Sequence, residues 1–336
     1  MKRLLKSLSN ARLFGDTVNL RINIEQTADK ETLRLAADFR WPHGTVTVHR
    51  RVIHGGLLPA VVESWYPVSN HSYGLILEDD VEISPLFYPW VKMSLLRYRY
   101  GSAKHRSQQL FGISLYQQKN LELRPEGRHR FSARLTFAAS LLPNPNTPYL
   151  SQIPCSWGAV YFPEHWQQFH EYLSLRLSNS LSALPINTIV APAVRSNKWT
   201  RSWKKYFIEM AYLRGYVMLY PNYPDYLSLS TNHLEVGSHV KDMPLEVYHQ
   251  KQKLFLLPLL QLPEIVGPGE VVTGLLDLPE GTMPLWHELP TLDLLGLVTD
   301  EKALKNRGAL RVLEIFGCDS KRRNVESLHV PRWLCA

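Results

Sequence analysis

Three consecutive carboxylates, Glu78, Asp79 and Asp80, follow directly on a short apolar run at residues 75–77. That run has the length and composition of a buried strand, so the carboxylates are expected at its carboxyl end. Open α/β sheets bind their ligands at this edge. Neighbouring carboxylates repel one another unless a cation lies between them, and Mg²⁺ and Mn²⁺ take oxygen ligands. The pattern predicts a divalent-metal site, and the alternative is a solvated acidic turn.

The elements around these carboxylates are predicted from residue periodicity and from capping residues. Ser84 and Pro85 have the residue types of an N-cap and a first helical position, and Asp29 is a second candidate N-cap. The pattern predicts helices at residues 1–13, 30–39, 57–65 and 85–100, and strands at residues 18–25, 45–53 and 73–77. Alternating strands and helices are typical of a mostly parallel sheet flanked by helices, so we expect an α/β fold. Because such a sheet normally begins with a strand, we expect the first strand to be missing.

The remaining chain divides into a more irregular middle and a Leu- and Pro-rich tail. Gly215 marks the end of one predicted helix. The expected elements are a strand at 111–116, a hairpin and long loop over 119–150, helices at 164–177 and 202–214, and a strand at 217–220. The tail carries one further helix near 300–316. We therefore expect one domain at residues 1–240 and an extension at residues 241–336 that packs on it.

Composition narrows the class of partner. The chain has 336 residues, 45% of them hydrophobic, with a net charge of +8 that suits an anionic ligand. Without a dense Lys/Arg run or about 18 consecutive apolar residues, we expect neither nucleic-acid binding nor a membrane span. Cys155, Cys318 and Cys335 have no metal-ligand spacing and no evident disulfide framework, and Cys155 is expected to act as a small buried hydrophobe.

Four segments taken together resemble the GT-A fold glycosyltransferases, which use nucleotide sugars. The similarity is strongest to a family-two-like group of plant and fungal glycosyltransferases, and looser to the N-acetylglucosaminyltransferase that starts N-glycan branching. It extends over roughly residues 1–240, and its segments are LILEDDVEIS (75–84), SWGAVYFPEHW (156–166), SWKKYFIEMAYLRGYVMLYP (202–221) and SLSTNHLEVGSH (228–239).

The resemblance implies a metal-dependent transfer of a sugar from a nucleotide-sugar donor, a UDP-sugar, to a hydroxyl group of a glycan or another acceptor. Asp80 would bind Mn²⁺ or Mg²⁺, which offsets the charge of the departing nucleoside diphosphate. Asp79 and Glu78 would contact the donor ribose, sugar hydroxyls or metal-bound water. The resemblance also implies a Golgi enzyme with a membrane anchor upstream of Met1.

Further binding residues are expected where strands end. Glu25 would contact the nucleobase or ribose, with a solvated strand end as the alternative. Gly55 and Gly56 precede a helix and would let the backbone approach the nucleotide, although a simple turn fits them equally.

Two ring side chains have candidate roles on the donor and acceptor sides. Trp157 matches the segment that shapes the acceptor side in related enzymes, and its alternative is a core tryptophan. His239 is a candidate metal or diphosphate ligand in the loop at residues 228–239, and its alternative is a structural histidine. We expect this loop to close over the donor diphosphate and exclude water.

The catalytic base is less evident, because an inverting transferase needs a carboxylate that deprotonates the acceptor hydroxyl. The N-acetylglucosaminyltransferase carries two Asp residues where this chain has Lys204 and Lys205. Glu209 is the one carboxylate in the predicted helix and is the candidate base, or else a helix-face residue without a catalytic role. Two other functions remain open: an inactive nucleotide- or sugar-binding descendant, and a nucleotidyltransferase.

Overall fold

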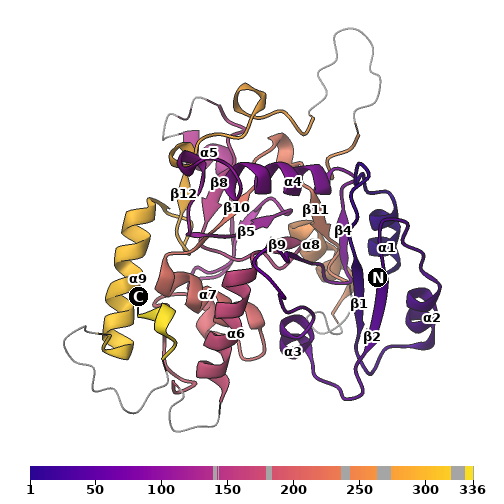
Figure 1. Cartoon of the computed structure of the whole chain (residues 1–336), viewed down its shortest axis with the longest axis horizontal. Helices are drawn as coiled ribbons and strands as arrows, with labels where there is room; N and C mark the ends of the chain where they lie inside the picture. Colours follow the sequence, from indigo (N-terminus) through magenta and orange to yellow (C-terminus); the bar gives the residue numbers. More distant parts are fainter. Residues whose placement is uncertain are drawn as a thin grey trace.

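The computed structural model describes residues 1–138, 142, 144–178, 184–235, 243–262, 274–318 and 330–335. A seven-stranded sheet with the order β13-β12-β8-β10-β5-β9-β3 forms its centre (Figure 1). In chain order the strands are Gly74–Ile76 (β3), Leu110–Ser114 (β5), Tyr149–Ser151 (β8), Ala159–Tyr161 (β9), Val217–Tyr220 (β10), Thr291–Leu292 (β12) and Val298–Thr299 (β13).

The pairings show that this sheet is mixed. Strand β10 runs parallel to β5, and β12 runs parallel to β8. The pairs β10–β8, β12–β13, β3–β9 and β5–β9 are antiparallel. The expected α/β sheet flanked by helices is confirmed, but the expectation of mostly parallel strands needs correction, because β9 runs antiparallel to both of its neighbours and β8 runs antiparallel to β10.

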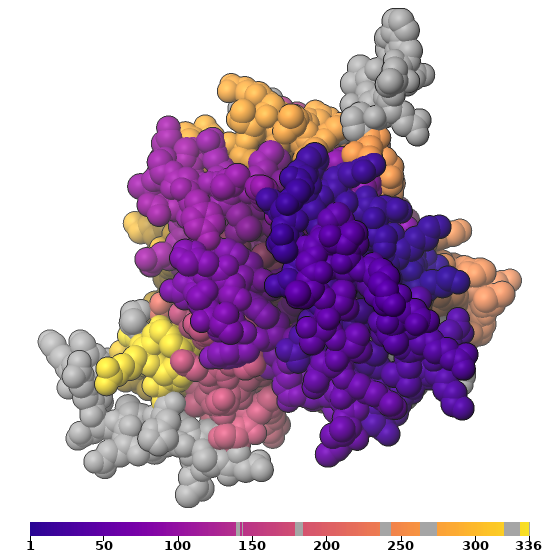
Figure 2. All heavy atoms as spheres, turned by 45° about the vertical axis from the view of Figure 1, so that its right-hand side comes forward, coloured from indigo at the N-terminus to yellow at the C-terminus, as the bar shows by residue number. Residues whose placement is uncertain are grey.

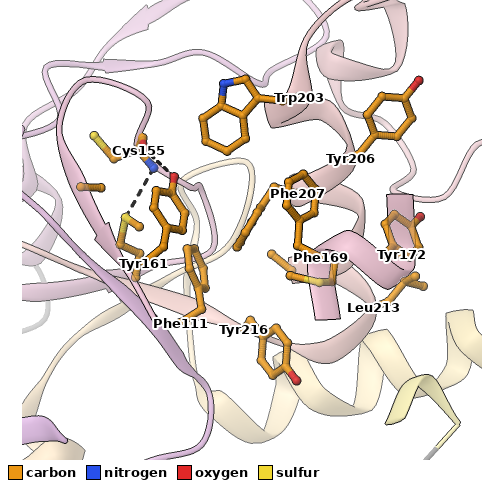
Figure 3. Packing of buried hydrophobic residues seen from close by; sticks show 14 of the residues in the cluster. Phe111, Cys155, Tyr161, Phe169, Tyr172, Trp203, Tyr206, Phe207, Leu213 and Tyr216 are labelled. Carbon is orange, nitrogen blue, oxygen red and sulfur yellow. Dashed lines mark hydrogen bonds between the residues drawn. The ribbon is translucent and has the colours of Figure 1, made fainter. Parts of the chain in front are cut away.

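Side chains alternate between two faces of the sheet, as the strand period of two residues requires. On β10, Met218 faces the helices α6 (Pro163–Leu177) and α7 (Trp203–Arg214), whereas Leu219 faces α4 (Phe87–Tyr98). The layer of α6 and α7 is rich in aromatic rings, with Phe207 near its centre (Figure 3). The ring centroids of Phe207 lie 4.7 Å from Phe169 and 4.9 Å from Phe111. Offset aromatic packing at these distances stabilises the layer beyond its buried area.

The N-terminal part of the chain forms a second, two-stranded parallel sheet from β1 (Leu20–Ile24) and β2 (Val46–Arg50). In the chain, helix α1 (Lys2–Ser9) precedes these strands, α2 (Lys30–Asp38) connects them, and α3 (Leu57–Val62) follows them. The Asp29 side chain accepts a hydrogen bond from Thr32 N at 2.7 Å, which confirms the predicted N-cap of α2. Figure 2 shows this part, in indigo and violet, on the side of the molecule opposite the yellow C-terminal residues.

The segment after β3 differs from the prediction. Residues Val81–Ile83 form a further strand, β4, which pairs antiparallel with β11 (Ser230–Asn232). Helix α4 begins at Phe87 with Leu86 as its N-cap residue, so it starts two residues later than predicted, and Pro85 is not at its first position. The Ser84 hydroxyl still accepts a hydrogen bond from Leu86 N at 3.0 Å, the contact expected of a capping serine, and it donates to the carbonyl oxygen of Leu260.

The C-terminal part does more than pack on the domain before it, because β12 and β13 belong to the large sheet. Its helices are α8 (Leu245–Phe255) and α9 (Glu301–Phe316). Helix α9 crosses α7 closely: a Cβ atom on Gly308 would lie 2.3 Å from the carbonyl oxygen of Leu213. Only glycine permits this approach. The predicted boundary near residue 240 remains a prediction, and the sheet crosses it.

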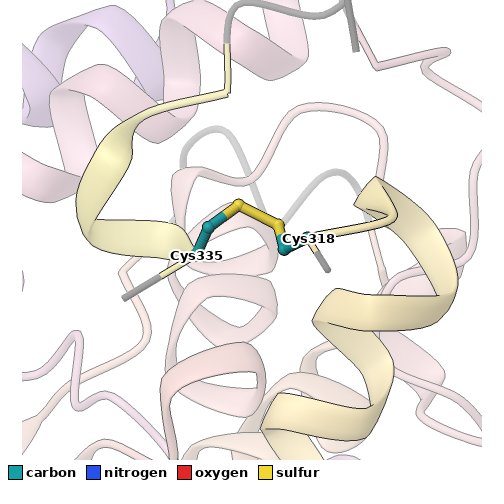
Figure 4. The surroundings of a disulfide bond; sticks show 2 residues. All are labelled: Cys318 and Cys335. Atoms are coloured by element: carbon teal, nitrogen blue, oxygen red, sulfur yellow. A yellow bond between two sulfur atoms is a disulfide. The ribbon is translucent and has the colours of Figure 1, made fainter. Parts of the chain in front are cut away.

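Cys318 and Cys335 form a disulfide with a Cα–Cα distance of 5.5 Å (Figure 4), which corrects the expectation that the cysteines give no framework. Cys155 is free and buried, as predicted. The smaller elements are a hairpin of β6 (Asn120–Leu121) and β7 (His129–Arg130), helix α5 (Ala133–Ala138), and the 3₁₀ turns Ala103–His105, Arg195–Lys198, Pro224–Tyr226, Pro279–Gly281, Trp286–Glu288 and Arg332–Leu334. No helix in the described ranges has the length and apolar character needed to span a membrane.

Candidate functional site

The three consecutive carboxylates form a turn that connects β3 to β4, and we call residues 78–80 the acidic turn. The turn is closed by a hydrogen bond from Val81 N to the carbonyl oxygen of Glu78 at 3.2 Å. Glu78 and Asp80 are half-buried, whereas Asp79 is exposed. The apolar run places these groups at the end of β3, as the sequence predicts.

The Met1 ammonium donates to the carbonyl oxygen of Asp79 at 2.6 Å, but the carboxylates of the acidic turn are only partly compensated. Burial, together with the charges of Asp80 and Asp79, raises the pKa of Glu78 to about 8, and the positive charge of Lys204 opposes this shift. Burial and the charge of Asp79 raise the pKa of Asp80 to about 6, to which Glu235 also contributes. A raised carboxylate pKa means that the surroundings disfavour the charged form. The turn would therefore gain stability from a cation.

The loop that follows β11 lies against the acidic turn. The Asn232 side-chain amide donates to Asp80 Oδ1 at 2.8 Å, and His233 N donates to the Asp80 carbonyl oxygen at 2.9 Å. The His233 Nε2 atom lies 2.7 Å from Glu82 Oε2. The described part of the predicted loop, through Glu235, thus contacts Asp80, and its closure over a donor diphosphate stays a prediction. His239 lies outside the described residues.

A divalent cation fits this place in charge and in ligand chemistry, since carboxylate oxygens are hard ligands. Within the described ranges, however, no group of three or more His, Cys, Asp or Glu side chains is arranged to hold a metal ion. The residues therefore fit a cation that takes the rest of its ligands from water or an anionic ligand, and they do not form a protein-only cage.

Glu25, Gly55 and Gly56 come together where β1 and β2 end. The Glu25 carboxylate accepts hydrogen bonds from Gly55 N at 3.3 Å and from Gly56 N at 3.2 Å. A hydrogen bond from Gln26 N is the main cause of its lowered pKa. Gly56 has a φ of +75°, which glycine adopts without strain. Two backbone amides that could face a nucleotide are thus occupied by a carboxylate of the chain itself.

Trp157 lies at a small pocket. Its ring packs edge-on against Tyr116 and Phe255, with ring centroids 4.8 and 5.0 Å away. The volume open to the centre of a water-sized molecule is ≈ 20 Å³, and the pocket's polar lining includes Gln118, Asn120, Glu122, Arg128 and Lys204. Trp157 is half-buried, so it both packs against the core and lines the pocket.

The pocket also contains an ion pair that the sequence did not predict. Lys204 Nζ donates to Glu122 Oε1, and their side chains are only 8% and 13% exposed. The Lys204 ammonium also lies 5.7 Å from the centroid of the Trp157 ring, a cation–π contact. Glu122 lies in a polar hairpin that also contains Glu126, and no local pattern distinguishes it.

Glu209, the candidate base, occupies a different environment. Its carboxylate is 1% exposed and accepts hydrogen bonds from Arg176 Nε and Tyr172 OH, each at 2.8 Å. A base must reach the acceptor hydroxyl, and this carboxylate has almost no accessible surface. The arrangement is that of a structural ion pair, so Glu209 is not included in the site that we propose below.

The comparison with known proteins gives one assignment. No curated protein matches this chain. The model of one family matches residues 1–118 and 128–181, a range that includes β1, the acidic turn and Trp157. Since these residues make up just over half of the 336 in the chain, the protein belongs to the family described as the SPBC1E8.03c C-terminal domain.

Proposed function

We propose that this protein is a metal-dependent glycosyltransferase that moves a sugar from a nucleotide sugar, a UDP-sugar, to an acceptor hydroxyl. The observation that carries the proposal is the acidic turn at the end of β3, where Glu78 and Asp80 have raised pKa values although the ammonium groups of Met1 and Lys204 act on the turn. Mn²⁺ or Mg²⁺ together with a diphosphate would supply both the missing charge and the missing ligands.

Asp80 is the side chain that we assign to the metal. Its Oδ1 is held by the amide of Asn232, which fixes the orientation of the carboxylate. When bound, the metal would offset the negative charge that develops on the leaving nucleoside diphosphate. The loop after β11 would exclude water from the donor, since its Asn232 and His233 already contact the acidic turn.

Other features support this arrangement. The net charge of +8 favours an anionic donor. Glu25 and the two glycines that it contacts would lie on the nucleoside side, with the carboxylate released to a ribose or base when the nucleotide binds. Trp157 would lie on the acceptor side, where aromatic faces stack on sugars.

The test measures nucleotide binding, both by thermal unfolding and by titration calorimetry. We expect UDP to raise the melting temperature in the presence of Mn²⁺ and to have no effect in EDTA. A panel of UDP-sugars then identifies the donor. Asp80→Asn should abolish the Mn²⁺-dependent shift, whereas Asp38→Asn, on the exposed end of α2, is the matched control and should retain it. The absence of any UDP-dependent shift in the unmodified protein would contradict the proposal.

One observation favours a second function, that of an inactive descendant that binds the nucleotide sugar without transferring it. The expected base, Glu209, is engaged with Arg176 and Tyr172 and is almost inaccessible. Binding of UDP without release of UDP from any UDP-sugar would identify this second function. Release of UDP would exclude it.

A further inference from the structure

The pocket beside Trp157 has a size that restricts what can enter it. A water molecule needs about 10–15 Å³ of space when measured for its centre. The pocket offers ≈ 20 Å³, which is room for one water or one hydroxyl group but not for a sugar ring. Its walls are aromatic at Tyr116, Trp157, Tyr220 and Phe255, so a hydroxyl inside it would be largely shielded from bulk water.

Glu122 is the carboxylate of this pocket. One of its oxygens, Oε1, accepts from Lys204, and within the described ranges Oε2 accepts no hydrogen bond. The carboxylate oxygen that Lys204 leaves free is available to accept a hydrogen bond from a hydroxyl group in the pocket. The contact with Lys204 fixes the orientation of Glu122, because both side chains are nearly buried.

The pocket adjoins the acidic turn. Ser230, on the strand that pairs with β4, donates from its hydroxyl to the carbonyl oxygen of Trp157 at 2.6 Å. A Cβ atom on Gly158 would lie 3.3 Å from Leu77 Cδ2, in the residue just before the turn. Lys204, which pairs with Glu122, also acts electrostatically on Glu78, so its ammonium is near enough to influence the turn. A donor bound at the turn would therefore place its sugar next to the pocket.

We propose that Glu122 is the general base of the sugar transfer and that the pocket holds the acceptor hydroxyl, an inference that rests on the proposed function. Glu122 Oε2 takes the hydroxyl proton while the acceptor oxygen forms a bond to the anomeric carbon. The bond from that carbon to the phosphate oxygen breaks, and its electron pair leaves with the nucleoside diphosphate. The proton then passes from Glu122 to solvent.

In this scheme Lys204 is a positioning residue, since it acts through Glu122. The acceptor presents a single hydroxyl to the pocket, and its bulk stays outside it, because the pocket is too small for a sugar ring. Glu122 lies between the two ranges that the family model matches, so the family assignment does not bear on this role, and the pocket alone supports it.

The experiment measures UDP release from UDP-sugars with Mn²⁺, using water as the acceptor, together with UDP affinity and melting temperature. Removal of a general base lowers rates by about 100- to 10,000-fold. We expect Glu122→Gln to lower the release rate by at least about 100-fold while UDP affinity stays within about twofold. Glu126→Gln, an exposed change between the same two strands, is the matched control and should leave all three quantities unchanged.

A second variant, Glu122→Asp, covers the case in which Glu122→Gln does not fold. It keeps the charge and the Lys204 pairing but shortens the side chain, so we expect a smaller loss of rate with unchanged UDP affinity. A release rate within about fivefold of the unmodified protein in the folded variant would overturn the role of Glu122 while leaving the glycosyltransferase proposal intact. If the unmodified protein binds no UDP, the proposed function itself fails.

Discussion

Two groups of carboxylates in this protein have opposite surroundings. Glu209 is buried between α6 and α7 with Arg176 and Tyr172 as partners, and its charge is compensated. The acidic turn is only half-buried, yet Glu78 and Asp80 have pKa values raised to about 8 and about 6. The more buried carboxylate, Glu209, therefore has its charge compensated by its partners. The more accessible carboxylates, Glu78 and Asp80, lie in surroundings that disfavour their charged form.

This difference separates a structural role from a functional one. A buried charge with a fixed partner contributes to the fold, and loss of the partner leaves an uncompensated charge in the interior. Carboxylates whose charge is not balanced by a fixed cation lower the stability of the fold until a ligand supplies the missing positive charge. Each of the following substitutions tests one side of this contrast.

The largest effect is expected at the buried pair. Glu209→Gln removes the charge that faces Arg176, and removal of one partner of a buried pair costs about 3–5 kcal/mol. We expect a strongly lowered midpoint in denaturant unfolding. The double variant with Arg176→Met should recover much of the loss, because no unpaired charge remains. If instead stability is unchanged and UDP release is lost, Glu209 is the base after all.

The next effect concerns Glu78 and pH. Its pKa rises from an ordinary value of 4.5 to about 8 on folding, so the folded state binds the proton more tightly. Stability from this group is complete below pH 4.5 and falls as pH rises toward 8. Allowing for partial solvent access, we expect the free energy of unfolding of Glu78→Gln to be about 2 kcal/mol higher than that of the unmodified protein at pH 8. At pH 4.5 the difference should be small. A pH-independent difference would contradict the raised pKa.

A smaller gain is expected from Asp80→Asn. Removal of one charge from the turn relieves its repulsion with Asp79, and we expect the free energy of unfolding to rise by about 1 kcal/mol without metal. Thermal unfolding in EDTA measures this gain, and the same variant should lose its Mn²⁺-dependent response to UDP. A clear loss of stability would mean that the Asn232 contact matters more than the repulsion.

The smallest effect is expected at Asp79, the exposed member of the turn. Substitutions on exposed surface away from special contacts change stability by less than about 0.5 kcal/mol. Asp79→Asn should therefore leave the melting temperature in EDTA nearly unchanged. If Asp79→Asn raises the free energy of unfolding as much as Asp80→Asn does, the total charge of the turn, and not the burial of its members, determines the destabilisation.

Local signals predicted part of this structure well. Asp29 caps α2 as its residue type and position indicate, and Gly215 ends α7 with a φ of +64°. Glu25, Gly55 and Gly56 were predicted separately and meet in space, because the carboxyl ends of two parallel strands lie at one edge. In each case the deciding interaction lies close in sequence or follows from strand pairing.

The features that the sequence analysis missed depend on distant contacts. Strand β4 exists because it pairs with β11, about 150 residues away, and the Ser84 hydroxyl that follows it donates to Leu260, 176 residues away. Strands β12 and β13 are two residues each, too short to show a period. The pairing of Glu122 with Lys204 spans 82 residues, so neither residue indicates the other in the sequence.

The Cys318–Cys335 bond makes part of the fold dependent on redox chemistry. It joins the end of α9 to the turn Arg332–Leu334, whose Leu334 is buried and whose Trp333 donates to Glu171 on α6. Glutathione and thioredoxin keep thiols reduced in the cytosol, where such bonds are rare. In protein made there, only non-covalent contacts would hold this turn in place. A protease would then cleave the turn more readily than it would in protein that matured in an oxidising compartment.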